Sequence, residues 1–176
     1  MPTTLPTQPI TPAAFASYGW MLGKPFPTDA AIPAFTNPAT DFWREHVFDP
    51  GQDGEPEILW VNYRNADNVS QLEKHLRTQQ AIVPLTGSIV HIVARSAADG
   101  SPDLTTLSAF MVRPGQGLCM APDCWHASRV QSAEVTCLML TRRSTTMDLV
   151  AHMNTGCAAQ ESMLAAVPTI EIMGNG

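Results

Sequence analysis

Two short segments of this 176-residue chain carry side chains that could together bind a divalent cation. Glu73 and His75 stand two positions apart, and side chains two apart on a strand point to the same face of a sheet. We expect the following turn to return Gln80 to that face, and a barrel to place His126 beside His75. Oxygen and nitrogen donors of these kinds suit Mn, Fe, Ni or Zn. The sequence therefore predicts a metal site at Glu73, His75, Gln80 and His126.

Three of these residues also fit ordinary structural roles. His75 could lie in solvent on an edge strand, and Glu73 could form a surface ion pair with Lys74 or Arg77. His126 could be a core histidine that donates a hydrogen bond to a backbone carbonyl. The shared spacing of the two segments favours the metal site over each of these roles.

The polar residues around the predicted site have more than one possible role as well. Gln80 could orient a bound water, because a neutral amide oxygen binds metals less well than a carboxylate. Arg64 could neutralise a substrate carboxylate or lie in solvent. His91 falls within an apolar strand and fits better as a core histidine with hydrogen-bond partners. His46 and His152 carry no signal.

Composition excludes several classes of protein. The net charge is −6 with only two lysines, whereas binding to nucleic acid or an anionic membrane requires clustered basic residues. No apolar run approaches the roughly 18 residues of a membrane span, and we see no signal peptide. The four cysteines form no CxxC pair, so we expect reduced thiols in a cytoplasmic protein.

The order of elements predicts an all-β fold. Short apolar segments separated by Gly/Pro turns at 8–12-residue spacing are typical of a β-sandwich or barrel. The segment 89–94 is continuously apolar, which indicates a strand buried on both faces. The expected strands are 58–63, 72–75, 81–85, 89–94, 107–112, 118–121, 124–127 and 135–141.

The remaining segments complete a single domain over residues 1–176, a length sufficient for a real core. We expect residues 1–9 to be loose and a short helix to follow, capped by Thr11. Four prolines between residues 23 and 41 oppose regular structure there beyond short extended pieces. The barrel core is expected at 58–143, with one or two helices over 146–167.

These segments resemble the two motifs of a cupin barrel, and more closely those of the ureidoglycolate lyases within that superfamily. The stretch from Gln71 to Gly87 resembles the hallmark segment of that family, and Asp99 to Phe110 resembles its aspartate-proline-aspartate loop. Residues 10–19 resemble the family's opening segment, and Trp125-His126 follows at the expected distance. The resemblance is strongest from 58 to 143.

The resemblance implies a cupin-type double-stranded β-helix barrel, or jelly roll, with C-terminal helices. It places Glu73 where cupins have a first histidine, His75 at the second, and Gln80 at the glutamate. His126 falls at the histidine of the second motif. The expected cofactor is a divalent transition metal. We also expect a homodimer, because a two-fold pair would cover apolar edge strands that a lone barrel leaves open.

The chain departs from the family pattern around this set. Ala121 and Ala127 stand where the family usually has histidines, and only Arg142 corresponds to the family's aspartate-arginine-glycine-glycine segment. The four predicted metal ligands are retained, whereas the residues around them are less polar than in the family. This combination is compatible with a different, more apolar substrate.

The resemblance implies release of urea and glyoxylate from ureidoglycolate, a small 2-hydroxy acid of purine (allantoin) degradation. In this hypothesis Glu73, if it is not a ligand, is the base, its pKa raised by an apolar barrel. Arg64 or Lys74 would hold the substrate carboxylate. The alternatives are a different metal-dependent cupin enzyme (isomerase, decarboxylase or dioxygenase) acting on a less polar molecule, and a non-catalytic small-molecule binder.

Overall fold

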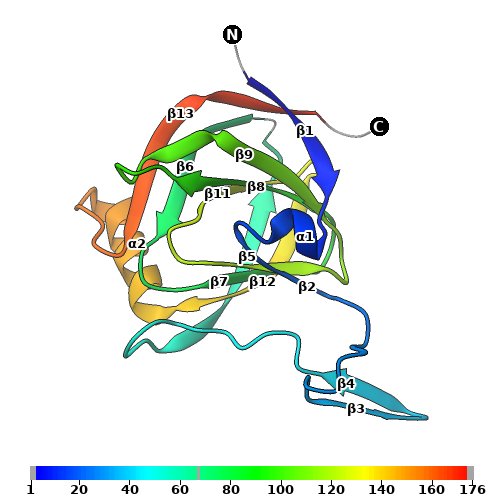
Figure 1. The fold of residues 1–176 in the computed structure, drawn as a ribbon. Coiled ribbons are helices and arrows are strands. Elements are labelled where there is room, and N and C mark those ends of the chain that lie inside the picture. The colour runs from blue at the N-terminus through cyan, green and yellow to red at the C-terminus, as the bar shows by residue number, and fades with distance from the viewer. Residues whose placement is uncertain (1–2, 67, 174–176) are drawn as a thin grey trace.

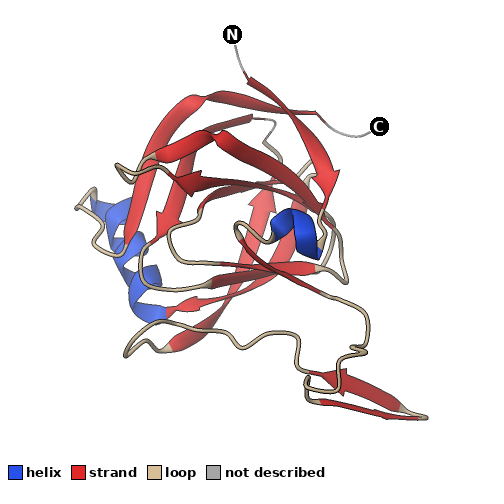
Figure 2. Ribbon diagram, viewed as in Figure 1, coloured by secondary structure: helices blue, strands red, loops and turns tan. Residues whose placement is uncertain are grey.

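The computed structural model describes residues 3–66 and 68–173 and consists mostly of strands, with two helices (Figure 2). Six strands form a closed barrel in the order β1-β13-β6-β11-β8-β9, and five form a sheet in the order β2-β10-β7-β12-β5. Figure 1 shows the five-stranded sheet beneath the barrel, and a hairpin of β3 and β4 standing away from both. The all-β cupin-type barrel predicted from sequence is confirmed.

The elements have the following bounds in chain order. They are β1 (Thr3–Pro9), α1 (Pro12–Phe15), β2 (Gly19–Leu22), β3 (Ala34–Asn37), β4 (Thr40–Trp43), β5 (Pro56–Arg64), β6 (Asn68–His75), β7 (Gln80–Pro84), β8 (Ile89–Ser96), β9 (Pro102–Val112), β10 (Gly117–Met120), β11 (Trp125–Arg129), β12 (Glu134–Arg142), α2 (Arg143–Thr155) and β13 (Ser162–Met173).

All eight strands predicted between residues 58 and 141 occur within a few residues of their expected bounds. The side chain of Thr11 caps α1, as expected, by accepting a hydrogen bond from the Ala14 amide at 3.2 Å. Neither helix in the described part of the chain is long and apolar enough to span a membrane.

The prediction that residues 1–9 are loose is wrong for the described residues of that segment. β1 pairs in parallel with β13 through residues 3–6 and with β9 through residues 7–9, and this insertion closes the barrel. A Pro/Thr-rich segment is extended by preference. The strands with which β1 pairs are separated from it by about a hundred residues or more in sequence. No local sequence pattern therefore predicts this pairing.

The prediction of helices over 146–167 is right for α2 and wrong beyond it. α2 ends at Gly156, whose left-handed backbone (φ 73°) lets its amide donate to the His152 carbonyl at 2.8 Å. The chain then enters β13, which pairs antiparallel with β6 and shifts register between Ala166 and Ile170. Pro168 lies within that shift, where a missing ladder hydrogen bond is tolerated.

Apolar side chains lie on both faces of β8, the central strand of the wall that separates two cores. Ile89 and Val93 belong to a cluster shared with the five-stranded sheet, whereas Val90, Ile92 and Ala94 belong to a cluster formed among the barrel strands. The wall is therefore buried on both sides, as the apolar run at 89–94 predicted.

Candidate metal centre

Two strands of the shared wall and the first residue of β7 supply the predicted ligands. His126 on β11 is paired in register with Glu73 on β6, and His75 lies two residues further along β6. Two-residue alternation keeps these three side chains on the same face of the wall. The turn after His75 returns the chain as β7, which begins with Gln80. The structure therefore brings all four residues together.

The three charged or titratable members form a compact group of donors. One ligand atom from each of Glu73, His75 and His126 lies within 4.8 Å of the others, and the two imidazole centres are 5.2 Å apart. Ligand bonds of about 2.0–2.2 Å place coordinating atoms at most roughly twice that distance apart. The observed separation exceeds that span by a few tenths of an ångström, which a small side-chain rotation removes.

One nitrogen of His126 has no hydrogen-bond partner within residues 3–66 and 68–173. Its Nδ1 donates to the Cys124 carbonyl at 3.0 Å, which fixes the ring orientation and leaves the lone pair on Nε2. Nε2 is buried and lies 3.4 Å from Glu73 Oε1, an ion-pair distance without hydrogen-bond geometry. A histidine anchored through Nδ1, with a bare Nε2 aimed at other donors, is the usual arrangement of a metal-ligating imidazole.

His75 is held from two sides. The Gln80 amide nitrogen lies 2.9 Å from Nε2, and the Ser162 hydroxyl on β13 lies 3.0 Å from Nδ1. An amide N–H donates, so Nε2 carries the lone pair and the Nδ1 hydrogen points to Ser162. Nε2 is the nitrogen of His75 on the side of the cluster, and a bound ion would take the place of the Gln80 amide hydrogen on its lone pair. Ser162 belongs to the segment that the sequence had assigned to a helix, so it could not have been foreseen.

The ionisation of Glu73 differs from the expectation. Burial alone would raise the pKa of this carboxyl, but the neighbouring imidazoles, His126 first, outweigh burial and lower the pKa to about 2. The predicted pKa near neutrality is therefore wrong, because the barrel wall around Glu73 is lined with imidazoles rather than apolar groups alone. Burial lowers the pKa of His75 to about 4, and the charge of His126 adds to that effect. An anionic carboxylate beside a neutral imidazole is a donor set for a cation.

His91 is confirmed as a core histidine with partners. It is fully buried, its Nδ1 lies 2.9 Å from the Ser128 hydroxyl and its Nε2 lies 3.0 Å from the Met120 sulfur. Its ring stacks on that of His126 with centres 5.8 Å apart. Because both nitrogens are occupied, His91 supports the cluster without offering a free donor.

Two residues predicted to hold a substrate carboxylate do not reach the cluster. Lys74 follows Glu73 on β6 and therefore points to the opposite face, where its amino group pairs with Asp123 at 3.1 Å. Arg64 lies on the outer face of β5, mostly exposed, and pairs with Glu134 at 3.1 Å. The residue one position earlier, Tyr63, is the one that faces inward.

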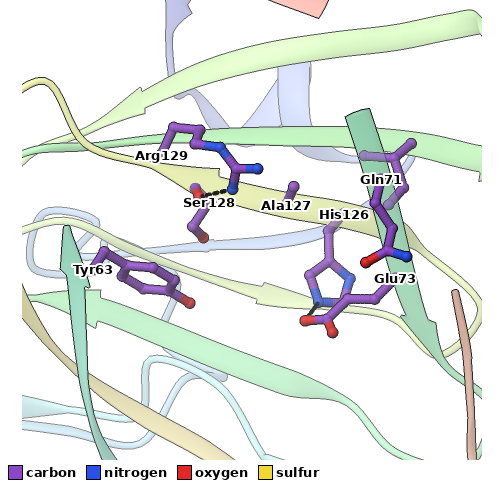
Figure 3. A pocket seen from close by; sticks show the side chains of 8 residues that line it. Tyr63, Gln71, Glu73, His126, Ala127, Ser128 and Arg129 are labelled. Atoms are coloured by element: carbon purple, nitrogen blue, oxygen red, sulfur yellow. Dashed lines mark hydrogen bonds and ion pairs between the residues drawn. The ribbon is translucent and has the colours of Figure 1, made fainter. Parts of the chain in front are cut away.

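A cavity of about 200 Å³ opens between β6 and β11 and reaches Glu73 and His126 (Figure 3). The two strands are matched at only one residue pair, and they diverge beyond it. The other side chains that line the cavity are Tyr63, Gln71, Leu72, Ala127, Ser128 and Arg129. The alternation of Gln71 with Glu73, and of Ser128 with His126, was a signal that could have identified two of them.

Two lining residues have chemistry suited to a polar ligand. Arg129 donates through Nε to the Asn68 carbonyl and through Nη1 to the Ser128 carbonyl, each at 2.7 Å, which bridges the diverging strands. Burial, with a smaller contribution from the charge of Glu73, raises the pKa of Tyr63 to about 12. Tyr63 therefore keeps its phenolic proton at neutral pH and is a hydrogen-bond donor.

The two alanines that depart from the family pattern occupy different places. Ala127 lines the cavity, and its side chain, on the opposite face of β11 from His126, packs against the cluster among the barrel strands. Ala121 lies in the turn before β11, at a separate shallow cavity with Asp123, and its amide donates to the Tyr18 carbonyl. Only Ala127 can therefore affect a ligand beside the metal centre.

Two solved structures align with part of this chain at low sequence identity. A TDP-quinovose 3,4-ketoisomerase from Campylobacter jejuni aligns with a TM-score of 0.41 and 15% identity over 68% of this chain and 81% of its own. A dTDP-6-deoxy-D-glucose-3,5-epimerase from Legionella pneumophila aligns with a TM-score of 0.40 and 14% identity over 63% and 64%.

Sequence comparison identifies relatives with a named activity. A ureidoglycolate lyase from Rhodobacter capsulatus is 29% identical over 120 residues, which cover 68% of this chain and 73% of the relative. A ureidoglycolate lyase from Escherichia coli is 36% identical over 58 residues, which cover 33% of this chain and 36% of that protein. The sequence profile of the ureidoglycolate lyase family matches residues 2–159. The chain therefore belongs to the ureidoglycolate lyase family.

Proposed function

We propose that this protein is a metal-dependent lyase that releases urea and glyoxylate from ureidoglycolate. Family membership supports the reaction class. The observation that carries the proposal is the buried Nε2 of His126, which has no hydrogen-bond partner among the described residues and faces the Glu73 carboxylate at the end of a cavity. A buried polar atom without a partner is costly in free energy, and a bound ion removes that cost.

The residues present fit a divalent transition metal. Glu73, His75 and His126 would hold it, and Gln80, already bonded to His75, would orient a ligand or serve as a fourth donor. Two imidazoles and a carboxylate suit Ni, Mn, Fe or Zn. When bound, such an ion polarises the hydroxyl and carboxylate oxygens of a 2-hydroxy acid and lowers the hydroxyl pKa.

The cavity residues would orient the substrate and move its proton. Arg129 would hold the substrate carboxylate, since the contacts described for it use Nε and Nη1 and leave Nη2 available. If the ion is held by His75, Gln80 and His126 instead, the anionic Glu73 carboxylate is the base that receives the hydroxyl proton. The C–N bond then breaks as the aldehyde C=O forms, and Tyr63, still protonated, donates to the leaving urea nitrogen. The proton taken from the substrate hydroxyl is then returned to the Tyr63 phenolate. The reaction therefore needs no co-reactant.

Ala127 favours a second candidate function. It lines the cavity and offers a ligand no polar side-chain atom, where the family usually has a histidine. A different metal-dependent cupin reaction on a less polar 2-hydroxy or keto acid would use the same ligands and the same arginine. A non-catalytic binder is the third hypothesis, and it predicts ligand binding without turnover.

The test measures metal content and urea release on the same preparation. We expect protein purified without chelator to contain close to one divalent ion per chain and to release urea and glyoxylate in equal amounts from ureidoglycolate. Bound metal without urea release would favour the second function, and a protein that takes up no transition metal would overturn the proposal. Arg64→Ala, on the outer surface, serves as a control with unchanged activity.

Replacement of Arg129 tests substrate orientation. Loss of a charge-assisted hydrogen bond costs about 1.5–3 kcal/mol, so we expect Arg129→Met to raise KM for ureidoglycolate roughly 10- to 100-fold. Metal content should be unchanged. A similar loss of activity in Arg64→Met, or an unchanged KM in Arg129→Met, would remove Arg129 from the proposed role.

A further inference from the structure

Gln71 lines the cavity beside the metal centre and has no role in the reaction proposed above. It stands two residues before Glu73 on β6, so its side chain lies on the same face of the wall as the ligands. Unlike Glu73, it is exposed, which places it at the opening of the cavity. Its amide can therefore meet the part of a ligand that extends away from the metal centre.

The register of two strands explains why this amide is uncovered. β6 and β11 run antiparallel and pair at Glu73 and His126. The same register, continued by two residues in each strand, would set Gln71 opposite Ser128. The described register holds no such second pair, and both residues line the cavity instead. The divergence of the strands therefore turns a cross-strand position into a ligand-facing one.

The amide of Gln71 is free, in contrast to those of the next two glutamines in the chain. Gln79 accepts a hydrogen bond from the Asp49 amide at 3.0 Å, and Gln80 donates to His75. The side chain of Gln71 makes no hydrogen bond to any residue that the structure describes. Its donor and its acceptor are both available to a ligand.

A free amide recognises a group that donates and accepts side by side. Its oxygen accepts and its NH₂ group donates, so it can pair at two points with a carbonyl oxygen that stands next to an NH₂. The ureido end of ureidoglycolate is such a group. A carboxylate has no hydrogen to donate and an aliphatic group offers neither contact, so neither would match Gln71 in this way.

The charges along the cavity favour the same placement. Arg129 is cationic and suits the substrate carboxylate, whereas Gln71 is neutral and suits an uncharged polar group. Figure 3 shows, in its view, the amide of Gln71 on one side of His126 and the guanidinium of Arg129 on the other. The cavity, at about 200 Å³, is smaller than the roughly 300–1,000 Å³ of sites for drug-sized ligands. A small molecule with a carboxylate at one end and an amide-like group at the other matches this distribution.

We propose that Gln71 determines specificity for the ureido group by binding its carbonyl oxygen and its terminal NH₂ group. This inference rests on the proposed function, because the ligand it names is the substrate of that reaction. A site that hydrogen-bonds a polar group of its substrate discriminates against analogues without that group more strongly than an apolar site does. Gln71 therefore separates ureido acids from other small acids that Arg129 could hold.

Two unreactive ligands test the proposal by titration calorimetry. Ureidoacetate and N-acetylglycine both carry a carboxylate, and neither has the hydroxyl from which the aldehyde forms. They differ at the far end, where ureidoacetate has an NH₂ group and N-acetylglycine has a methyl group. We expect the wild type to bind ureidoacetate roughly three- to tenfold more tightly, the value of one neutral hydrogen bond. Gln71→Met, which keeps the length of the side chain, should lose that preference.

Two variants serve as controls. Gln8→Met, at an exposed glutamine on β1 outside the cavity, should keep the wild-type preference. Arg129→Met should weaken both ligands by the same factor, because their carboxylates are identical. Thermal melting checks that each variant is folded.

The outcomes separate this proposal from the reaction itself. A wild type without the preference, a preference that survives Gln71→Met, or a protein that binds neither ligand would overturn the role of Gln71. Neither ligand is turned over, so the preference is measured whether or not urea is released. Loss of the preference in Gln71→Met alone would support the role even if ureidoglycolate is not cleaved, and urea release with an unchanged preference would refute only the role of Gln71.

Discussion

Lys74 and His126 are buried to almost the same extent, on opposite faces of one wall, and they differ in what surrounds their polar atoms. The side chain of Lys74 donates to Ser96 and to the Gly100 carbonyl, and it pairs with Asp123, each at 3.0–3.1 Å. It also lies 5.0 Å above the Trp125 ring. The Nε2 of His126 has no hydrogen-bond partner in the part of the chain that the structure describes.

The difference separates a polar group whose hydrogen-bonding positions are all filled from one that has a position open to a ligand. A buried charge with all its donors occupied stabilises the turn that it joins, and it has nothing left to offer a ligand. A buried nitrogen with a free lone pair is retained at a free-energy cost. Lys74 and His126 are almost equally buried. The number of hydrogen-bond partners, and not the extent of burial, therefore distinguishes the face of β6 that can bind a ligand.

The largest effect should come from removing the unpartnered nitrogen. We expect His126→Ala to lower metal affinity by well over 100-fold and to abolish urea release, since a ligand matters more than the outer groups whose loss costs 10- to 100-fold. Metal analysis after dialysis measures the first effect. His152→Ala, a half-buried histidine on α2 outside the cluster, is the control. Full metal occupancy in His126→Ala would contradict the assignment of His126 as a ligand, and with it the difference proposed between His126 and Lys74.

The pH dependence of stability tests the histidine face directly. The pKa of His75 is about 4 in the folded protein and near 6.5 unfolded, so the unfolded chain binds this proton first. The free energy of unfolding of the metal-free protein should therefore fall as pH drops from about 6.5 towards 4, by up to about 3 kcal/mol. The lowered pKa of Glu73 extends the loss below pH 4.5. Urea unfolding with chelator present measures it, and His75→Gln should remove the upper part of the slope; equal slopes in the two proteins would contradict the assignment.

Ser162 and Ser128 form a matched pair for the next test. Each hydroxyl bonds the Nδ1 of a buried histidine, but only Ser162 holds a proposed ligand. We expect Ser162→Ala to weaken metal binding roughly 10- to 100-fold, whereas Ser128→Ala should change it little. Metal titration monitored by competition with a chromogenic chelator compares them. Equal effects would mean that His91 belongs to the ligand set.

The smallest effect is expected on the other face of the wall. Lys74→Met removes hydrogen bonds and an ion pair but leaves Asp123 largely in water, so we expect a loss of about 1–2 kcal/mol in the free energy of unfolding. Metal content and urea release per folded molecule should be unchanged. Loss of either activity or metal in a folded Lys74→Met protein would show that this lysine does act on the site.

Sequence patterns predicted the central strands and the site residues carried on them. The β8 run and the alternation of Glu73 with His75 are local, and both occur as expected. Arg64 and Tyr63 show the limit of such reasoning: the end of β5 was located correctly, but the face was wrong by one residue. A one-residue shift reverses which side chains point inward.

What the sequence alone determined is the set of strands and the donor types, since these follow from apolar runs, turn residues and two-residue alternation. Only the tertiary structure decided that β1 and β13 close the barrel, that Ser162 orients His75, and that Arg129 and Tyr63 line the cavity. These contacts join residues that are mostly far apart in the chain. Strand pairing at such separation cannot be predicted from local sequence patterns. The charge of Glu73 was decided in the same way, because the imidazoles that lower its pKa, and not its burial, set the outcome.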